Sequence, residues 1–157
     1  MLFLRFTFGD GPCVIPARDV VEVVPQVRLR TLPHGPPYLA GVFDFRGEVL
    51  PVVDLSLLAL GRPSRPLYST RILVVDLGER EKRLLGLLAE GVTDTVERPE
   101  SGFGGDGAIF ELSLELGEIA TETGEILQRL RLDRALPENF GDLLATAMSR
   151  EGLHDPD

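Results

Sequence analysis

The sequence predicts a mainly β protein made of two small, closed, five-stranded barrels. Two observations support this prediction. Short apolar runs, alternating or continuous and bounded by Gly, Pro and Asp-Gly turns, recur along most of the 157 residues, as is typical of short strands. The order of these runs in the first half is repeated in the second. Five short strands per unit suit a closed barrel, because closure removes exposed sheet edges.

The first unit begins with a hairpin. Residues 2–8 alternate, Asp10-Gly11 is a strong hairpin-turn signal, and residues 13–16 return as a second strand. The run over 19–24 is β-branched, carries an acid at its centre and is ended by a proline. We therefore expect a hairpin followed by a third, acid-bearing strand.

A second hairpin and a short helix complete this unit. Strands over 38–45 and 49–53 flank a tight turn. Asp54 is a candidate N-cap for a helix over 55–60, and Gly61 is a candidate left-handed residue at its end. These signals predict two helical turns at the close of the first unit.

The second half has the same order of elements, followed by a longer helix. Apolar residues at helical spacing predict this helix over 139–149, with Asn139 as its N-cap. The helical spacing is carried by Phe140, Leu143, Leu144, Ala147 and Met148. Strands are expected over 71–77, 84–88, 92–96, 108–112, 117–121 and 125–127, with a Gly-rich loop over 101–107.

Two alignments between the halves indicate an internal duplication. Residues 19–24 resemble 91–96 at an offset of 72, and residues 47–55 resemble 124–132 at an offset of 77. A unit of about 75 residues is only marginally stable alone, so the two units are expected to pack into one body.

Two charged residues of the first unit are candidates for partner recognition. Arg46 corresponds to Thr123 in the second half, and a packing role shared by both barrels does not need a guanidinium in only one. Glu22 interrupts an apolar run and, in an alternating strand, faces the same side as Val20 and Val24. The alternatives are a solvated turn arginine and an edge-strand charge that prevents aggregation.

The composition excludes several classes of function. There are 16 Lys+Arg against 25 Asp+Glu, and this net charge of −9 argues against nucleic-acid binding. The charge is +1 over residues 1–70 and −10 over 71–157. One Cys and two His are too few for the usual zinc sites, and a single Cys fits a reducing compartment. No apolar stretch reaches about 18 residues, so we expect a cytoplasmic protein without membrane insertion.

No catalytic set is predicted. The loop over 102–107 matches G-x-G-x-x-G, but it lacks the strand before and the helix after that phosphate binding requires. His34 lies in a proline-rich turn and His154 near the end of the chain, and neither is near a nucleophile motif. Cys13 follows a proline in a strand, where an inert thiol is usual. We therefore expect no enzyme, no metal and no cofactor.

The longest motif lies in the first unit. Residues 19–24, Leu32-Pro33 and 37–55 resemble the CheW-like family of chemotaxis coupling proteins. The family pattern there is V-x-E-V, L-P and P-x-[FY]-x-x-G-[VI]-[IT]-N-L-R-G-x-[VI]-[VL]-P-[VI]-[VI]-D-L. The resemblance covers nearly the whole chain. The sequence differs from the pattern at Phe43-Asp44-Phe45, where the family has I-N-L, and at 88–92, where it has V-V-D-x-V.

The resemblance implies a single domain over residues 1–150 with two five-stranded SH3-like barrels. The first barrel is expected at about 12–70 and the second at about 71–137, with allowance for strand exchange from the N-terminus. A C-terminal helix and a frayed tail are expected over 138–157.

The resemblance also implies a non-enzymatic adaptor. Such proteins hold a CheA-type histidine kinase against the cytoplasmic tip of a methyl-accepting chemoreceptor, and they are recruited to membrane receptor arrays. No residue is assigned to the kinase contact. The alternative is a regulatory protein that sequesters or inhibits a kinase without coupling a receptor. By motif position, the residues implied to face the receptor are Val20, Glu22, Gly41, Arg46 and Gly47.

Overall fold

The computed structural model describes residues 1–9, 11–78, 80–99, 119–122, 125–131, 136 and 139–150. Its elements in chain order are β1 (Leu2–Phe8), β2 (Gly11–Pro16), a 3-10 turn η1 (Ala17–Asp19), β3 (Val20–Pro25), β4 (Leu39–Phe45), β5 (Glu48–Asp54), α1 (Leu55–Leu60), β6 (Arg71–Asp76), β7 (Leu84–Ala89), β8 (Thr95–Glu97), β9 (Ile119–Glu122), β10 (Glu125–Arg129) and α3 (Phe140–Arg150). The features expected at 101–107, 108–112, Thr123 and 152–157 lie outside the described residues.

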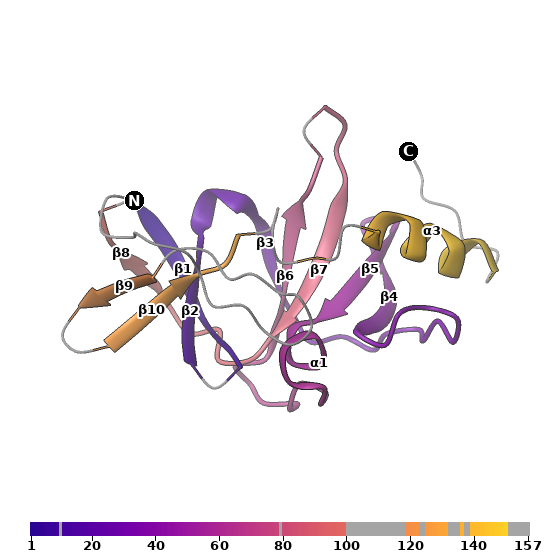
Figure 1. Cartoon of the computed structure of the whole chain (residues 1–157). Coiled ribbons are helices and arrows are strands. Elements are labelled where there is room, and N and C mark those ends of the chain that lie inside the picture. Colours follow the sequence, from indigo (N-terminus) through magenta and orange to yellow (C-terminus); the bar gives the residue numbers. More distant parts are fainter. Residues whose placement is uncertain are drawn as a thin grey trace.

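The strands form two five-stranded sheets that lie side by side (Figure 1). The first barrel has the order β3-β6-β7-β5-β4, and the second has the order β8-β1-β2-β10-β9. All neighbouring strands are antiparallel except β5 with β7 and β2 with β10. This arrangement confirms the predicted fold class of two five-stranded units with short helices.

The strands are not divided between the barrels as the sequence suggested. The hairpin β6–β7, expected in the second barrel, pairs with β3 and β5 of the first. The hairpin β1–β2 pairs with β8 and β10 of the second barrel. The grouping of strands at 12–70 and 71–137 is therefore wrong, because each half donates its leading hairpin to the other half's sheet. Strand exchange from the N-terminus is present, and it is reciprocal.

The register of the parallel pairs supports the internal duplication. Val52 lies opposite Gly86 in the first barrel, and Arg129 lies opposite Val14 in the second. The offset of 72 between the halves relates Gly86 to Val14, and the offset of 77 relates Val52 to Arg129. The second pair is therefore the repeat of the first. Both alignments made from the sequence therefore hold at residue level in the folded chain.

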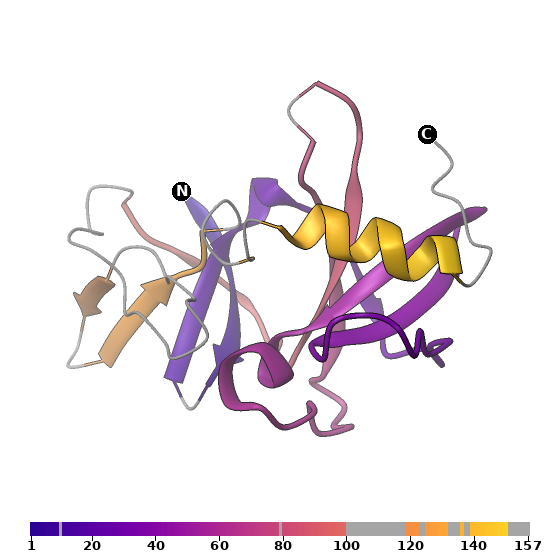
Figure 2. The ribbon, with the colours of Figure 1, turned by 45° about the vertical axis from the view of Figure 1, so that its right-hand side comes forward.

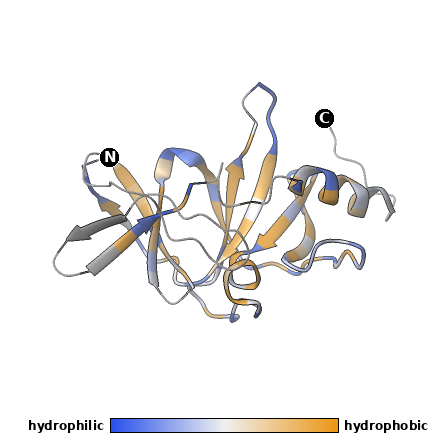
Figure 3. Ribbon diagram, in the orientation of Figure 1, coloured by the Kyte–Doolittle hydropathy of each residue, from blue (hydrophilic) through white to orange (hydrophobic). Residues whose placement is uncertain are grey.

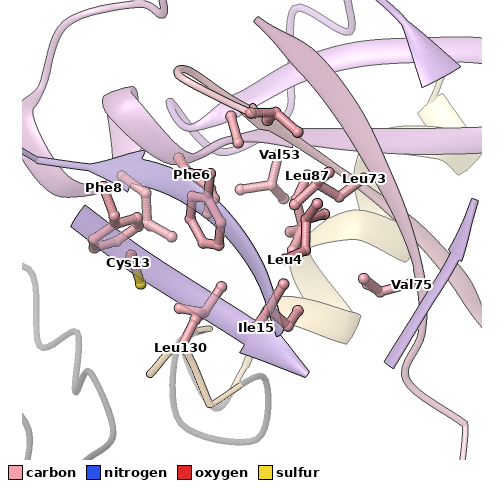
Figure 4. Close-up of a cluster of buried hydrophobic side chains, with 14 of the residues drawn as sticks. Leu4, Phe6, Phe8, Cys13, Ile15, Val53, Leu73, Val75, Leu87 and Leu130 are labelled. Atoms are coloured by element: carbon pink, nitrogen blue, oxygen red, sulfur yellow. The ribbon is translucent and has the colours of Figure 1, made fainter. Parts of the chain in front are cut away.

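The largest buried cluster lies between the barrels and draws on both sheets (Figure 4). Because the exchanged hairpins alternate in side-chain direction, one face of each fills its own barrel and the other fills this shared core. Each such buried side chain contributes about 1.5–3 kcal/mol. The cluster includes Leu4, Phe6, Cys13 and Ile15 from the second barrel and Val53, Leu73, Val75 and Leu87 from the first. The two units thus share one core.

Hydrophobic strands and a hydrophilic connection are clearly separated in the hairpin β6–β7 of the first barrel. Strands β6 and β7 are apolar along most of their length, whereas the loop between them is hydrophilic (Figure 3). The barrel is closed between the chain after β3 and the outer edge of β4, where Arg30 and Val42 exchange two backbone hydrogen bonds of 2.8 and 2.9 Å. This bridge joins the two edges of the first sheet.

The helix α1 begins and ends as predicted. The Asp54 carboxylate accepts hydrogen bonds from the backbone N–H groups of Ser56 and Leu57, and Gly61 has a left-handed φ of 74°. Asp54 itself is buried. The terminal aspartate of the family motif is thus a structural residue.

The C-terminal helix α3 crosses the outside of the first barrel beside β4 and β5 (Figure 2). Ala147 and Met148 pack with Leu39 and Val42, and Phe140 reaches the shared core. Leu143, expected on the same apolar face, is instead 38% exposed. The contact stripe of α3 is therefore narrower than the sequence suggested and consists of Phe140, Leu144, Ala147 and Met148. No helix among the described residues is long and apolar enough to cross a membrane.

Candidate functional site

The turn between β4 and β5 has an unusual backbone. Its two central residues, Arg46 and Gly47, have φ values of 54° and 86°. A two-residue hairpin turn of this kind requires positive φ at both positions and normally selects Asn-Gly. Arg46 is the only non-glycine residue with positive φ in the described part of the chain. Such a conformation costs about 1–2 kcal/mol, and strain of this kind is typically retained at functional positions.

Arg46 and Glu22 form an ion pair across the barrel surface. The guanidinium carbon Cζ also lies 4.9 Å from the centroid of the Phe45 ring, within cation–π range. The Arg46 side chain remains 69% exposed and that of Glu22 32% exposed. The structure therefore brings together two of the residues that the sequence singled out, and it leaves the arginine accessible.

Asp44 holds this turn from within the same hairpin. Its Oδ1 accepts a hydrogen bond from the backbone N–H of Gly47 at 2.7 Å. An amide oxygen can accept the same bond, so the asparagine of the family pattern and the aspartate of this chain suit the same turn. We call Glu22 and residues 44–47 the hairpin tip.

Alternation along the strand predicted that Val20 and Glu22 share a face, but in the structure they do not. A bulge between Val20 and Glu22 shifts the register of β3 against β6. Val20 and Val23 pack against the shared core, whereas Val24 packs against the interior of the first barrel. Val21 is the extra residue of the bulge, so the side chains before and after it no longer alternate in step. Val21 itself is 50% exposed.

Gly41 lies away from the hairpin tip, near the start of β4. It is buried, has a φ of 149°, and its backbone lies directly against Arg30 where the barrel closes. The structure thus gives Gly41 a role in barrel closure, and it separates this glycine from Gly47, which is exposed in the turn.

The linker over residues 61–70 has no helix or strand but is fixed by two buried carboxylates. Asp54 accepts hydrogen bonds from the backbone N–H (2.9 Å) and the hydroxyl (2.6 Å) of Ser64. Glu90 accepts bonds from the backbone N–H (2.8 Å) and from Nη2 (3.0 Å) of Arg65. The linker is therefore held in one conformation.

The fixed linker borders a groove lined by both apolar and polar residues. Tyr68 is fully exposed and Leu67 is 47% exposed. A pocket of about 590 Å³ lies between the linker and the end of β3. The lining residues are Val23, Pro25, Gln26, Pro66, Leu67, Tyr68, Thr70 and Arg71. We call this surface the linker groove. Val23 faces away from Glu22 on β3, so the linker groove and the hairpin tip are separate surfaces.

Two buried groups have altered acidity. Burial raises the pKa of Glu90, but the hydrogen bonds and charge of Arg65 outweigh it, so the pKa is lowered overall. Burial raises the pKa of the Cys13 thiol far above its ordinary value, which makes this thiol unreactive. The sequence-based expectation of an inert cysteine agrees with this environment.

The described residues hold no group of three or more His, Cys, Asp or Glu side chains that could bind a metal ion. Burial also raises the pKa of Tyr38, which packs beside Phe140 at a centroid distance of 6.0 Å and belongs to the core.

Sequence reasoning missed several residues of these surfaces. The hydrogen bond of Asp44 was not predicted, although its position just before a two-residue turn is a usable signal. The pairing of Arg65 with Glu90 had only a weak signal, an acid that ends the apolar run of β7. The exposure of Leu67 and Tyr68 had none, because a linker sequence does not reveal which side chains face water.

The comparisons with known proteins agree with this architecture. The CheW-like domain family matches residues 2–138. Protein FrzA of Myxococcus xanthus is 33% identical over 154 residues, covering 94% of this chain and 88% of that protein. Chemotaxis protein CheW of Rhizobium meliloti (strain 1021) is 29% identical over 140 residues, covering 85% and 86%. The scaffolding protein TtCheW from Thermoanaerobacter tengcongensis shares the fold with a TM-score of 0.71 at 21% identity, covering 83% and 84%. The resemblance seen in the sequence is confirmed, and the chain belongs to the CheW-like domain family.

Proposed function

We propose that this chain is a non-enzymatic adaptor that couples chemoreceptors to a CheA-type histidine kinase in a chemotaxis or chemotaxis-like pathway. The observation that carries the proposal is the hairpin tip, where an exposed arginine is held in a strained conformation and paired with Glu22. Membership of a family whose relatives are named as chemotaxis proteins supports the same class of function.

The hairpin tip is the proposed receptor-facing surface. An amphipathic helical hairpin laid against the first barrel would meet Arg46 and Glu22 as polar groups that set its register. Gly47 is exposed in the turn and permits close backbone approach. Val20, which packs against the shared core, and Gly41, which lies at the barrel closure, are included only by motif position, as residues adjacent to this surface.

The linker groove is the proposed kinase-facing surface. An adaptor that joins two proteins needs two separate surfaces, and the groove, with Leu67 and Tyr68 exposed beside it, lies on the opposite face of β3. Aromatic residues such as Tyr68 in a rigid setting are typical anchors of protein interfaces. Arg71, at the edge of the groove, favours a carboxylate on the partner.

Reversing the charge of Arg46 tests the receptor surface. Arg46→Glu places a carboxylate beside Glu22 and Asp44, so receptor binding is expected to fall about 100-fold, below detection in co-sedimentation with receptor-containing membranes. The fold is expected to persist because the side chain is mostly solvated. Circular dichroism and the denaturation midpoint provide this control. Unchanged co-sedimentation of a folded variant contradicts the assignment.

Truncating Tyr68 tests the kinase surface. Tyr68→Ser is expected to weaken the capture of kinase about tenfold or more while receptor co-sedimentation stays normal. The change lies on the surface and is expected to alter stability by less than about 0.5 kcal/mol. Leu143→Ser, at an exposed apolar residue on α3, is the matched control. Equal loss in both variants, or none in Tyr68→Ser, argues against the linker groove.

The alternative function is a regulatory protein that sequesters or inhibits a histidine kinase without a receptor. The two functions separate when the protein is added to kinase alone and to kinase with receptor-containing membranes. An adaptor changes kinase activity only when the receptor is present. A change with kinase alone favours the regulatory function.

A further inference from the structure

We propose that Asp44 is a positioning residue that fixes Arg46 in its binding conformation through the backbone of Gly47. This inference rests on the proposed receptor contact of the hairpin tip. It concerns how the contact is prepared before the partner arrives, and it assigns a role to a residue at which this chain differs from its family pattern.

The backbone of the turn needs such a restraint. An arginine at the first central position of a two-residue turn favours negative φ, and the observed value of 54° is sparsely populated for a non-glycine residue. Gly47 adopts its φ of 86° freely and therefore does not force its neighbour to follow. Left to itself, the turn would sample conformations in which Arg46 points elsewhere.

Asp44 provides the restraint from the first strand of the hairpin. The bond of 2.7 Å from the Gly47 N–H to Asp44 Oδ1 encloses Phe45 and Arg46 and closes the turn over Arg46. The Asp44 carboxylate makes no other hydrogen bond or ion pair among the described residues. The bond lies at the surface. Its main effect is therefore on the conformation of the turn, and its effect on the core is small.

The side chain of Arg46 is restrained separately. Glu22 reaches it from β3, and the Phe45 ring lies beneath the guanidinium. These contacts orient the side chain only when the backbone already directs it towards β3. Asp44 thus acts one step before Glu22, and together they lower the entropy that a partner must remove on binding.

The hydrogen bond can be separated from the charge by two variants. Asp44→Ala removes both, and Asp44→Asn keeps an oxygen acceptor for Gly47 while removing the charge. Asp44→Ala is expected to weaken receptor binding about three- to tenfold, the range of one hydrogen bond, and Asp44→Asn to restore it to within about twofold of wild type. Glu48→Ala, at the first residue of β5 and outside the hairpin tip, is the matched control and is expected to bind as wild type.

Three measurements on the whole 157-residue chain test the proposal. Titration of receptor-containing membranes gives the affinity, kinase capture reports the other surface, and hydrogen exchange of the Gly47 amide reports the bond itself. A positioning role is supported if the Gly47 amide exchanges faster in Asp44→Ala than in wild type and more slowly in Asp44→Asn than in Asp44→Ala. Kinase capture should be unchanged in both variants. Equal losses of affinity in Asp44→Ala and Asp44→Asn, or in Asp44→Ala and Glu48→Ala, overturn it, because the charge would then be responsible.

Different results would contradict the receptor contact of the hairpin tip and the positioning role of Asp44. If Arg46→Glu leaves receptor binding intact, the receptor contact itself is wrong. If Arg46→Glu abolishes binding and Asp44→Ala binds as wild type, the receptor contact stands and the positioning role of Asp44 is wrong.

Discussion

Gly41→Ala is expected to lower the free energy of unfolding by about 3 kcal/mol or more, the largest effect we predict for a single added methyl group. Gly41 has a φ of 149°, a conformation that residues with a Cβ rarely adopt. A Cβ at this position would lie 2.5 Å from the carbonyl oxygen of Arg30, and this contact is with backbone. The alanine therefore meets conformational strain and a clash that no side-chain rotation relieves.

The clash falls where the first barrel closes. Arg30 and Val42 exchange the hydrogen bonds that join the chain after β3 to β4, and Gly41 adjoins this pair. Moving Arg30 away to admit a methyl group would break these bonds and open the barrel edge.

The measurement is denaturant unfolding of wild type, Gly41→Ala and Gly61→Ala. Gly61 also has positive φ, 74°, but a Cβ there meets nothing within 4 Å. Gly61→Ala therefore reports conformational strain alone, about 1 kcal/mol. If both alanines destabilise the protein equally, the close approach to Arg30 does not matter and our account of barrel closure is wrong.

Glu90→Gln is expected to lower the free energy of unfolding by about 2 kcal/mol at neutral pH. Glu90 is 5% exposed and accepts three hydrogen bonds from Arg65 through both carboxylate oxygens. Glutamine offers one oxygen and turns an NH₂ group towards a donor-only guanidinium. The expected result is a weaker attachment of the linker and a less rigid linker groove.

The effect of Glu90→Gln depends on pH in a defined direction. The pKa of Glu90 is lower in the folded chain than its ordinary value of about 4.3, so the folded state favours the ionised form. Its contribution is complete above the unfolded pKa and is lost as pH falls through the folded pKa. The difference in stability between wild type and Glu90→Gln should therefore be constant near neutrality and shrink below about pH 4.3.

Paired denaturation curves between neutral and acidic pH test this prediction. Glu97→Gln, at an exposed acid on β8, is the matched control and is expected to match wild type throughout. A Glu90→Gln deficit that is absent at neutral pH, or that grows on acidification, contradicts the role given to the Arg65–Glu90 pair.

The motif that identifies this family contains residues of two physical kinds. Gly41 and Asp54 are buried and hold the barrel edge and the linker in place. Arg46 and Gly47 lie at the surface of the hairpin tip. A motif position is therefore not by itself a contact, and substitutions at the two kinds of position should separate loss of fold from loss of binding.

Local signals were sufficient for much of the fold. The Asp10-Gly11 turn, the Asp54 cap and the Gly61 end each depend on a few neighbouring residues, and they predicted β1–β2 and α1 at nearly their observed bounds. The candidates Glu22 and Arg46 were also found from sequence, because a charge in an apolar strand and a guanidinium in only one repeat are visible without coordinates. The duplication likewise followed from spacing alone.

Long-range pairing was decided only by the tertiary structure. The exchange of the hairpins β1–β2 and β6–β7 depends on which apolar faces bury each other, and both assignments have the same local pattern. The bulge at Val21, the positive φ of Arg46 and the capture of Arg65 by Glu90 depend on contacts between residues far apart in the chain. The sequence by itself thus determined the strands, the repeat and the candidate charges, whereas packing decided which strands meet and how Arg46 is presented, because only the folded chain brings the two halves' apolar faces together.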